Sequence, residues 1–315
     1  MTAELPAGLT VRPARPDDDA AIAAQLAAYT SALIGFPKHS AEDVANYLRD
    51  PKLRLATDSW LVHDGDRLVG TATALAHNVP GQVDVDVFSA DPAVAAWLLD
   101  RACAHAVDRA RGADLAEVKL RVGVLREDTA LPELLAGFTL ETSIQRMRID
   151  HPEPPPVPEP PAGVVLRRGA FDDATRRAAH AVIAGAFADQ PGAVPRPYDD
   201  WLASREARST FDWSQLTVAE LDGRAVAVQE CNDNLVRSDR CGYIGRLGVL
   251  PGARGRGLAK YLLLDQFAQD AAAGLTGTML HVDSSNPTPA VALYRGVGMR
   301  PNAVSDLWSK VVPLG

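Results

Sequence analysis

The two halves of this 315-residue chain repeat one order of sequence signals at a nearly constant offset of about 155 to 160 residues. Each half opens with a short apolar stretch that carries an arginine and precedes paired aspartates, at 9–18 and at 164–173. In both halves an Asp-Gly pair then joins two apolar stretches, within 60–70 and 216–227, which predicts a β-hairpin. A fixed offset indicates an internal duplication, so we expect two domains of the same fold.

A proline-rich segment separates the two halves. Residues 151–163 read HPEPPPVPEPPAG, and proline fixes φ and removes backbone donors, which favours an extended spacer. We therefore expect a first domain at 1–150, a linker at 151–163 and a second domain at 164–315. Strand and helix signals are mixed in each half, which predicts the α/β class with a mixed, α+β type of sheet.

Composition excludes several classes of function. A formal net charge of −8 argues against a nucleic-acid binder. The negative charge is compatible with a cationic substrate, and an acidic surface that only keeps the protein soluble is the alternative. No apolar stretch approaches the roughly 20 residues that span a bilayer. Cys103, Cys231 and Cys241 lack metal-ligand spacing. We expect a cytoplasmic protein without membrane, nucleic-acid or metal partners, either a monomer that is a pseudo-dimer of its tandem domains or a homodimer.

The stretch VLPGARGRGLAKYLL, residues 249–263, has no counterpart in the first half. Residues 242–250 predict a strand and residues 258–273 predict a helix, so the glycines lie between a strand and a helix N-terminus. Unpaired N–H groups and the helix dipole favour phosphate at such a place, and glycines let the backbone curl around it. Arg254 and Arg256 either pair with phosphate oxygens or point into solvent. The loop predicts a pyrophosphate site, although a plain glycine turn before a core helix is the alternative.

The order of residues in this loop distinguishes between pyrophosphate ligands. A Walker A motif needs Lys directly after the last glycine, where this chain has Leu258, and a Rossmann fingerprint needs glycine where it has Lys260. Arg254, Gly257 and Ala259 instead fit Arg-x-x-Gly-x-(Gly or Ala). This pattern resembles the signature of the GNAT N-acetyltransferase superfamily, whose members bind the pyrophosphate of acetyl-coenzyme A (acetyl-CoA) at this loop.

A second signature of the same superfamily follows downstream. Asn286, Ala290, the Leu-Tyr pair that ends at Tyr294 and the Gly-Met pair that ends at Met299 resemble it, with Met299 in place of the usual phenylalanine. The resemblance implies that Asn286 contacts the cofactor and that Tyr294 lies near the thioester sulfur. A turn residue and a core aromatic are the alternatives. The resemblance covers residues 164–312 well and the first half only in outline.

The resemblance implies direct attack of a small-molecule amine on acetyl-CoA in a ternary complex. A backbone N–H on the strand before the loop would stabilise the oxyanion, and Tyr294 would protonate the leaving thiolate. Glu230 is the first choice for the general base, with His281 and Asp283 as alternatives. The positions expected to contact acetyl-CoA are Leu247, Gly248, Val249, Arg254, Gly255, Arg256, Gly257, Leu258, Ala259 and Asn286.

The first half lacks both signatures. After the strand pattern at 83–88 it reads SADPAVAAW, which supplies no glycine and places Asp91 where phosphate would lie. We therefore expect a degenerate first domain that does not bind the cofactor. Similar tandem layouts occur in enzymes that acetylate a cysteinyl pseudodisaccharide and in enzymes that acetylate antibiotics. A non-catalytic acyl-CoA-binding or regulatory module, and a structural duplication without a ligand, are the other interpretations.

Overall fold

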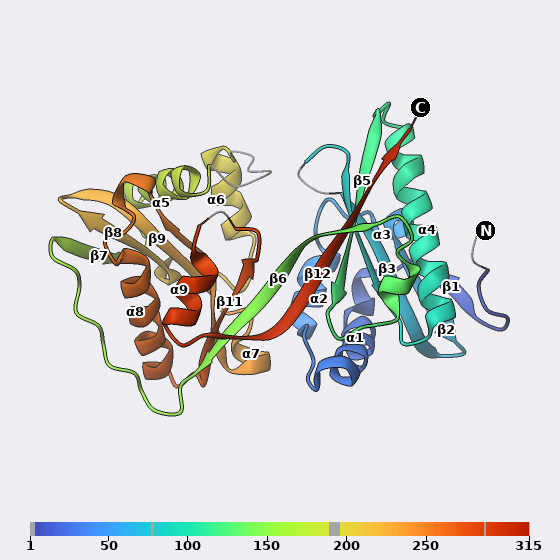
Figure 1. The fold of residues 1–315 in the computed structure, drawn as a ribbon, viewed down its shortest axis with the longest axis horizontal. Coiled ribbons are helices and arrows are strands. Elements are labelled where there is room, and N and C mark those ends of the chain that lie inside the picture. Colours follow the sequence, from blue (N-terminus) through green and yellow to red (C-terminus); the bar gives the residue numbers. More distant parts are fainter. Residues whose placement is uncertain (1–3, 77–78, 189–195, 287, 315) are drawn as a thin grey trace. The chain divides into compact units, whose positions relative to one another are not determined.

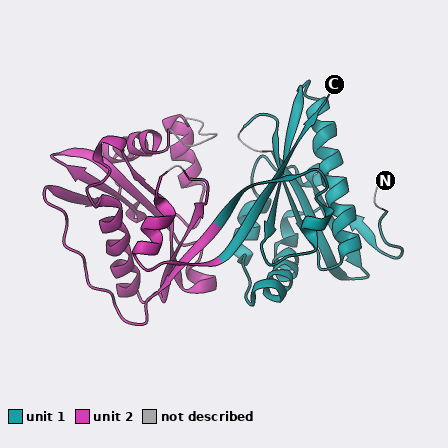
Figure 2. Ribbon diagram, viewed as in Figure 1, with its two compact units in different colours: residues 1–144, 303–315 teal, residues 145–302 magenta. Residues whose placement is uncertain are grey.

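The computed structural model describes residues 4–76, 79–188, 196–286 and 288–314 (Figure 1). The chain divides into two units, coloured separately in Figure 2. Unit 1 contains Met1–Ile144 and Ala303–Gly315, and unit 2 contains Gln145–Asn302.

The sheet of unit 1 has the strand order β1-β2-β3-β4-β5-β12. The parallel pair is β4 and β5, whereas β1–β2, β2–β3, β3–β4 and β5–β12 are antiparallel. The strands are β1 (Thr10–Arg12), β2 (Ser59–Asp64), β3 (Arg67–Ala76), β4 (Gln82–Phe88), β5 (Glu117–Leu125) and β12 (Arg300–Pro313).

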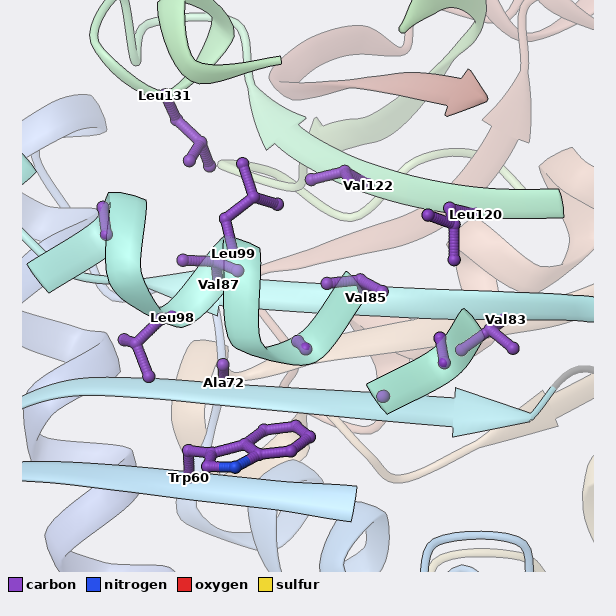
Figure 3. Packing of buried hydrophobic residues seen from close by; sticks show 14 of the residues in the cluster. Trp60, Ala72, Val83, Val85, Val87, Leu98, Leu99, Leu120, Val122 and Leu131 are labelled. Carbon is purple, nitrogen blue, oxygen red and sulfur yellow. The ribbon is translucent and has the colours of Figure 1, made fainter. Parts of the chain in front are cut away.

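Helices cover both faces of the unit 1 sheet. Figure 3 shows α4 (Pro92–Arg111) in front of the strands, where Val85 and Val87 of β4 belong to the same buried cluster as Leu98. Side chains alternate along a strand, so Asp86 of β4 lies on the other face, where Tyr47 of α2 donates a hydrogen bond to it. The helices are α1 (Asp19–Ile34), α2 (Ala41–Leu48), α3 (Leu55–Asp58) and α4.

Unit 2 repeats this plan with the strand order β6-β11-β10-β9-β8-β7. Its parallel pair is β10 and β11, which matches β4 and β5 of unit 1. The strands are β6 (Thr139–Asp150), β7 (Val164–Arg168), β8 (Leu216–Leu221), β9 (Arg224–Asn232), β10 (Cys241–Val249) and β11 (Gly277–Asp283). The proline-rich segment 151–163 joins β6 to β7.

In unit 2, α8 covers one face of the sheet, and α5 and α6 cover the other. Phe267 of α8 packs with Leu280 of β11, whereas Val182 of α5 and Trp201 of α6 pack with Val228 of β9. The helices are α5 (Asp173–Ala186), α6 (Tyr198–Glu206), α7 (Val236–Asp239), α8 (Leu258–Ala272) and α9 (Ala290–Gly296). Short 3-10 turns occur at Pro16–Asp18, Leu131–Leu134, Trp213–Gln215 and Pro251–Ala253.

These elements confirm the predicted α/β class with a mixed sheet and both predicted hairpins, β2–β3 and β8–β9. The predicted strand before the glycine loop and the helix after it are β10 and α8, each within one residue of its expected ends. No helix in the described ranges is both long and apolar enough to cross a bilayer.

The two units follow a different division from the expected ranges 1–150 and 164–315. Unit 1 includes the C-terminal strand, because Ser305–Pro313 of β12 pair with Glu117–Leu125 of β5. Strand β6 in turn provides the sixth strand of the unit 2 sheet. Each sheet is therefore completed by a strand from the other half of the sequence.

Candidate functional site

The glycine loop in unit 2 connects the end of β10 to the start of α8. Gly255 and Gly257 have φ values of 77° and 78°, in the left-handed region that favours glycine. A Cβ added at either position would meet nothing within 4 Å. Glycine is therefore favoured at these two positions by the positive φ of the backbone, and not by a lack of space for a side chain.

The N-terminus of α8 has no side-chain cap. Gly257 is the N-cap residue, and the first intrahelical hydrogen bond runs from the Tyr261 N–H to the Gly257 carbonyl at 2.9 Å. Within the described part of the chain, the backbone N–H groups of residues 255–260 have no hydrogen-bond partner. Together with the positive end of the α8 dipole, these donors form a place suited to an anion.

The matching helix of unit 1, α4, is capped differently. The Asp91 carboxylate accepts hydrogen bonds from the N–H groups of Ala93 at 2.8 Å and Val94 at 3.4 Å. The Ser89 hydroxyl in turn accepts from the Asp91 N–H at 3.2 Å. A carboxylate of the chain itself thus occupies the helix N-terminus in unit 1, at the position that is open in unit 2.

The two arginines of the loop differ in their contacts. The Arg254 guanidinium donates to the carbonyl oxygens of Val249 and Ala186, both at 3.1 Å, so it ties the loop to the ends of β10 and α5. Arg256 is exposed and has no partner among the described residues. Arg256 is therefore the loop arginine whose guanidinium is available to a ligand.

Strand β10 separates from β11 just before the loop. It pairs with β9 as far as Val249, but with β11 only from Cys241 to Ile244. Backbone groups of a strand point alternately to its two edges, so Arg246–Val249 present unpaired groups on the β11 side. Gly248 allows a close approach of α5, because an added Cβ would lie 3.0 Å from the Ala186 Cβ.

Tyr294 of α9 lies in a buried cluster that includes Ile244 of β10 and has Leu247 packed against it. Its side chain is 9% exposed, and burial raises the pKa of its phenol to about 12. In the described ranges the Tyr294 hydroxyl has no hydrogen-bond partner. It is therefore a neutral proton donor that is free to meet a ligand.

Asn286 and Leu258 have contacts that restrict what they can offer a ligand. The Asn286 Oδ1 accepts from the Thr288 N–H at 3.0 Å and from its hydroxyl at 2.7 Å, which leaves the amide nitrogen of Asn286 for a ligand. The Leu258 side chain is buried in the core, so only its backbone faces the loop. Ala259 is half-buried in the first turn of α8.

Glu230 of β9 is 1% exposed and forms ion pairs with two arginines. Arg205 of α6 donates to its carboxylate through Nε at 3.2 Å and through Nη2 at 3.0 Å, and Arg246 of β10 donates through Nη1 at 3.1 Å. We call Arg205, Glu230 and Arg246 the arginine–glutamate network. Sequence reasoning selected Glu230 but missed both arginines.

The alternative bases predicted from the sequence also have partners. The His281 Nδ1 lies 2.8 Å from the Tyr243 hydroxyl, and the Asp283 Oδ1 accepts from the N–H of Ser285 at 2.8 Å. Both residues belong to β11.

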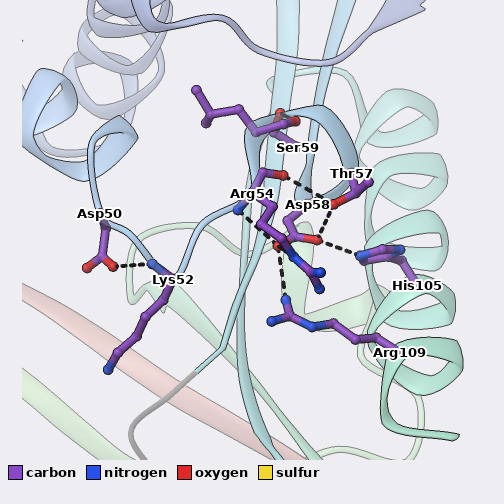
Figure 4. Close-up of polar contacts among 9 residues, drawn as sticks. Asp50, Lys52, Arg54, Thr57, Asp58, Ser59, His105 and Arg109 are labelled. Atoms are coloured by element: carbon purple, nitrogen blue, oxygen red, sulfur yellow. Dashed lines mark hydrogen bonds and ion pairs between the residues drawn. The ribbon is translucent and has the colours of Figure 1, made fainter. Parts of the chain in front are cut away.

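Unit 1 contains a separate polar cluster around the fully buried Asp58 (Figure 4). His105 Nε2 lies 2.8 Å from its carboxylate, and Arg109 Nη1 donates to it at 3.0 Å. Burial opposes ionisation of Asp58, but hydrogen bonds from His105 and Thr57 outweigh it and lower the pKa of the carboxyl. The adjacent Ser59 hydroxyl donates to a backbone carbonyl, so the cluster offers no nucleophile and serves to hold the fold.

Comparison with known sequences places the glycine loop in a known family. Residues 183–299 match the acetyltransferase (GNAT) family. A mycothiol acetyltransferase from Frankia casuarinae is 40% identical over 153 residues, which cover 45% of this chain and 44% of that protein. The chain thus matches less than half the length of that relative. A mycothiol acetyltransferase from Streptomyces coelicolor is 28% identical over 92% of this chain and 94% of its own length.

Comparison with solved structures supports the fold of the whole chain. A GCN5-related N-acetyltransferase from Sphaerobacter thermophilus superposes with a TM-score of 0.84 and 26% identity, over 98% of each chain.

Proposed function

Because residues 183–299 form a domain of the acetyltransferase (GNAT) family, we propose that this chain transfers the acetyl group of acetyl-CoA to the amine of a small molecule. The amine attacks the thioester directly in a ternary complex. Unit 2, which contains most of the expected range 164–315, acts as the catalytic domain, and unit 1, which contains most of the expected range 1–150, acts as a domain that does not bind the cofactor. We place the protein in the cytoplasm, as a monomer or a homodimer, without a nucleic-acid partner.

The open N-terminus of α8 is the observation that carries this proposal. The unpartnered N–H groups of residues 255–260 and the exposed Arg256 suit the pyrophosphate of acetyl-CoA. The same position in unit 1 is filled by the Asp91 carboxylate, which would repel a phosphate. This contrast supports one cofactor site per chain.

Acetyl-CoA supplies the thioester, and the residues of unit 2 act on the groups that change charge. Backbone N–H groups of Leu247–Val249 at the open edge of β10 stabilise the oxyanion of the tetrahedral intermediate. Tyr294 donates the proton that the departing thiolate needs, because its buried hydroxyl stays neutral and has no partner in the described part of unit 2.

The role of Glu230 as the general base, which accepts the proton of the amine, stays a prediction. Both oxygens of the Glu230 carboxylate already accept hydrogen bonds from Arg205 or Arg246, so a proton from the amine reaches Glu230 only through a water molecule or after a guanidinium moves. Replacing Glu230 by Gln keeps the shape and removes the charge. If Glu230 is the base, Glu230→Gln lowers kcat and abolishes its rise with pH; an unchanged pH profile of kcat excludes that role.

Two classes of acceptor are considered, together with one alternative in which the protein is not an enzyme. The names of the relatives favour a mycothiol-synthase-like enzyme, and an antibiotic-acetylating enzyme has a similar tandem layout. A non-catalytic acyl-CoA-binding module is the alternative to an enzyme. The unpartnered Tyr294 hydroxyl beside β10 favours the enzyme, because binding alone needs no proton donor at the sulfur.

Calorimetric titration with acetyl-CoA tests the site. The Gly257→Asp variant places in unit 2 the carboxylate that caps α4 in unit 1, and Gly257→Asn is the matched uncharged control, since both residues tolerate positive φ. We expect Gly257→Asp to weaken binding at least about fivefold more than Gly257→Asn, because a charge at a helix N-terminus contributes about 1 kcal/mol. Equal affinities, or no binding by the unmodified protein, would contradict the proposal. Release of free thiol in the presence of an amine panel then separates the enzyme from the binding module.

A further inference from the structure

The arginine–glutamate network holds more positive than negative charge. Its two guanidinium groups face one carboxylate, and Arg208 adds a further positive influence on Arg205. Burial of this kind is costly unless each charge is paired, and it lowers the pKa of Arg205 to about 10. The network therefore has about one positive charge that Glu230 does not balance.

Arg246 is the member that can offer this charge to a ligand. Every guanidinium nitrogen of Arg205 has a partner, either Glu230 or the Ser204 hydroxyl, and its Cζ atom lies 5.0 Å from the centroid of the Trp201 ring. Arg246 uses only Nη1, and its Nε and Nη2 have no partner among the described residues. Its side chain is 37% exposed, against 1% for Arg205.

Arg246 also lies at the point where the proposed reaction takes place. It is on β10 two residues after Ile244, the last residue that pairs with β11, and directly before the strand segment assigned to the oxyanion. A bulge between Ile244 and Arg246 interrupts the register with β9 at this point. Arg246 is opposite Glu230 in that register, so the carboxylate fixes the direction of its guanidinium.

The duplicated unit shows that the fold does not need this charge. The register partner of Asp86 in β4 is Thr73 in β3, just as the partner of Arg246 in β10 is Glu230 in β9. In unit 1 the Tyr47 hydroxyl from α2 contacts both Asp86 and Thr73, where unit 2 uses Arg205 from α6. The same framework therefore forms with a carboxylate in place of the Arg246 guanidinium and a hydroxyl in place of the Glu230 carboxylate, so the fold requires neither member of this ion pair.

We infer that Arg246 binds an acidic group of the acceptor, so that the acetylated molecule is an amine that also carries a carboxylate or a phosphate. This inference rests on the proposed acetyl transfer and names its substrate class, which differs from the cysteinyl pseudodisaccharide of a mycothiol-synthase-like enzyme because that acceptor carries neither acidic group. A guanidinium recognises both anions through paired hydrogen bonds. Its charge also disfavours the ammonium form of the nearby amine, which must be neutral to attack. Arg205 and Glu230 act as positioning residues for Arg246.

Paired amines that differ only in the acidic group test this inference. Thiol release from acetyl-CoA is measured with tyrosine and tyramine, and with glucosamine 6-phosphate and glucosamine. We expect the acidic member of at least one pair to have a kcat/KM at least about tenfold higher, as one good ionic contact provides. The Arg246→Gln variant should bring that ratio close to one, mainly through KM, and Arg246→Lys should retain part of the preference. Arg237→Gln, which removes an exposed charge from α7, should leave the ratio unchanged.

Three results would overturn the inference: a plain amine that equals or exceeds its acidic partner in every pair, a preference that survives Arg246→Gln, or acetyl-CoA binding without turnover of any acidic amine. Acetyl-CoA affinity measured on the same samples separates this inference from the proposed function. Failure of the unmodified protein to bind acetyl-CoA contradicts the proposed function. Loss of acetyl-CoA affinity in Arg246→Gln alone would assign Arg246 to the acyl donor and refute its role toward the acceptor.

Discussion

Replacing Asp270 by Asn should stabilise unit 2 at neutral pH. Asp270 lies in the last turn of α8 and is 5% exposed, and burial raises the pKa of its carboxyl to about 6. It accepts hydrogen bonds from the Thr278 hydroxyl and from Gln266 Nε2, the latter at 2.7 Å. An Asn side chain has the same shape as the protonated carboxyl and can keep both contacts, with its amide nitrogen donating to the Thr278 hydroxyl.

The size of the effect follows from the difference between the two pKa values. The folded carboxyl has a pKa of about 6 and the reference value is 3.8. Because the folded pKa is the higher one, the contribution to stability is complete below pH 3.8 and is lost as the pH rises through about 6. The difference of about two units corresponds to about 3 kcal/mol. Between pH 4 and pH 7.5 the Asn variant should therefore gain up to about 3 kcal/mol over the unmodified protein.

Urea unfolding at a series of pH values, with hydrogen exchange of α8 and β11 amides to report on unit 2, measures this gain. The control is Asp199→Asn, which removes an exposed carboxylate from α6 and should follow the pH dependence of the unmodified protein. A constant difference between Asp270→Asn and the unmodified protein across this range would refute the reasoning, since it would mean that Asp270 takes up no extra proton in the folded state.

Three further predictions concern the chemistry and the packing. Tyr294→Phe should lower kcat by about 10²-fold or more while acetyl-CoA affinity stays within about twofold, because a general acid acts mainly in the transition state; full kcat at several pH values would exclude it from the mechanism. Asp58→Asn should reduce the free energy of unfolding by about 3 kcal/mol at pH 7, because the buried carboxylate is lost from its ion pair with Arg109 and its contact with His105. Its lowered pKa means that this loss should shrink as the pH falls below 3.8, and an equal denaturation midpoint at pH 7 would count against the role. Gly242→Ala should cost about 2 kcal/mol, because the added Cβ would lie 2.1 Å from a buried carboxylate oxygen of α8; the matched strand change Gly123→Ala meets nothing within 4 Å and should alter the thermal midpoint little.

Local signals made much of the fold and part of the site predictable. The two hairpins follow from Asp-Gly turns, whose positive φ values are required by the turn itself, as at Asp222 and Gly223. The α8 N-terminus follows from glycines beside an apolar helix pattern. The Asp91 cap, which was not predicted from the sequence, also has a local signal, because aspartate is a preferred N-cap residue and here precedes a proline and an apolar run.

The features that escaped prediction depend on partners far away in the sequence. Arg205 sits in a helix whose charges read as solvent-facing, and only the packing of α6 over β9 buries it against Glu230. Arg246 offered a weak signal, a charge inside an apolar strand, but its partner is on the neighbouring strand. The pairing of β12 with β5 has no local signal in the sequence. The hydrophobic pattern of a strand indicates which face it buries, but it does not indicate which sheet the strand joins.

Because β6 belongs to the unit 2 sheet and β12 to the unit 1 sheet, the two units complete their folding in a fixed order during translation. Unit 2 spans Gln145–Asn302, so all of its strands exist before the last residues of the chain are made. Most of unit 1 precedes unit 2 in the sequence, yet β5 pairs with Ser305–Pro313 of β12, and until these residues are made β5 presents an edge open to wrong partners. The unit whose residues are mostly translated first thus finishes folding last, and loss of Ser305–Pro313 would harm unit 1 and spare the unit that carries the glycine loop.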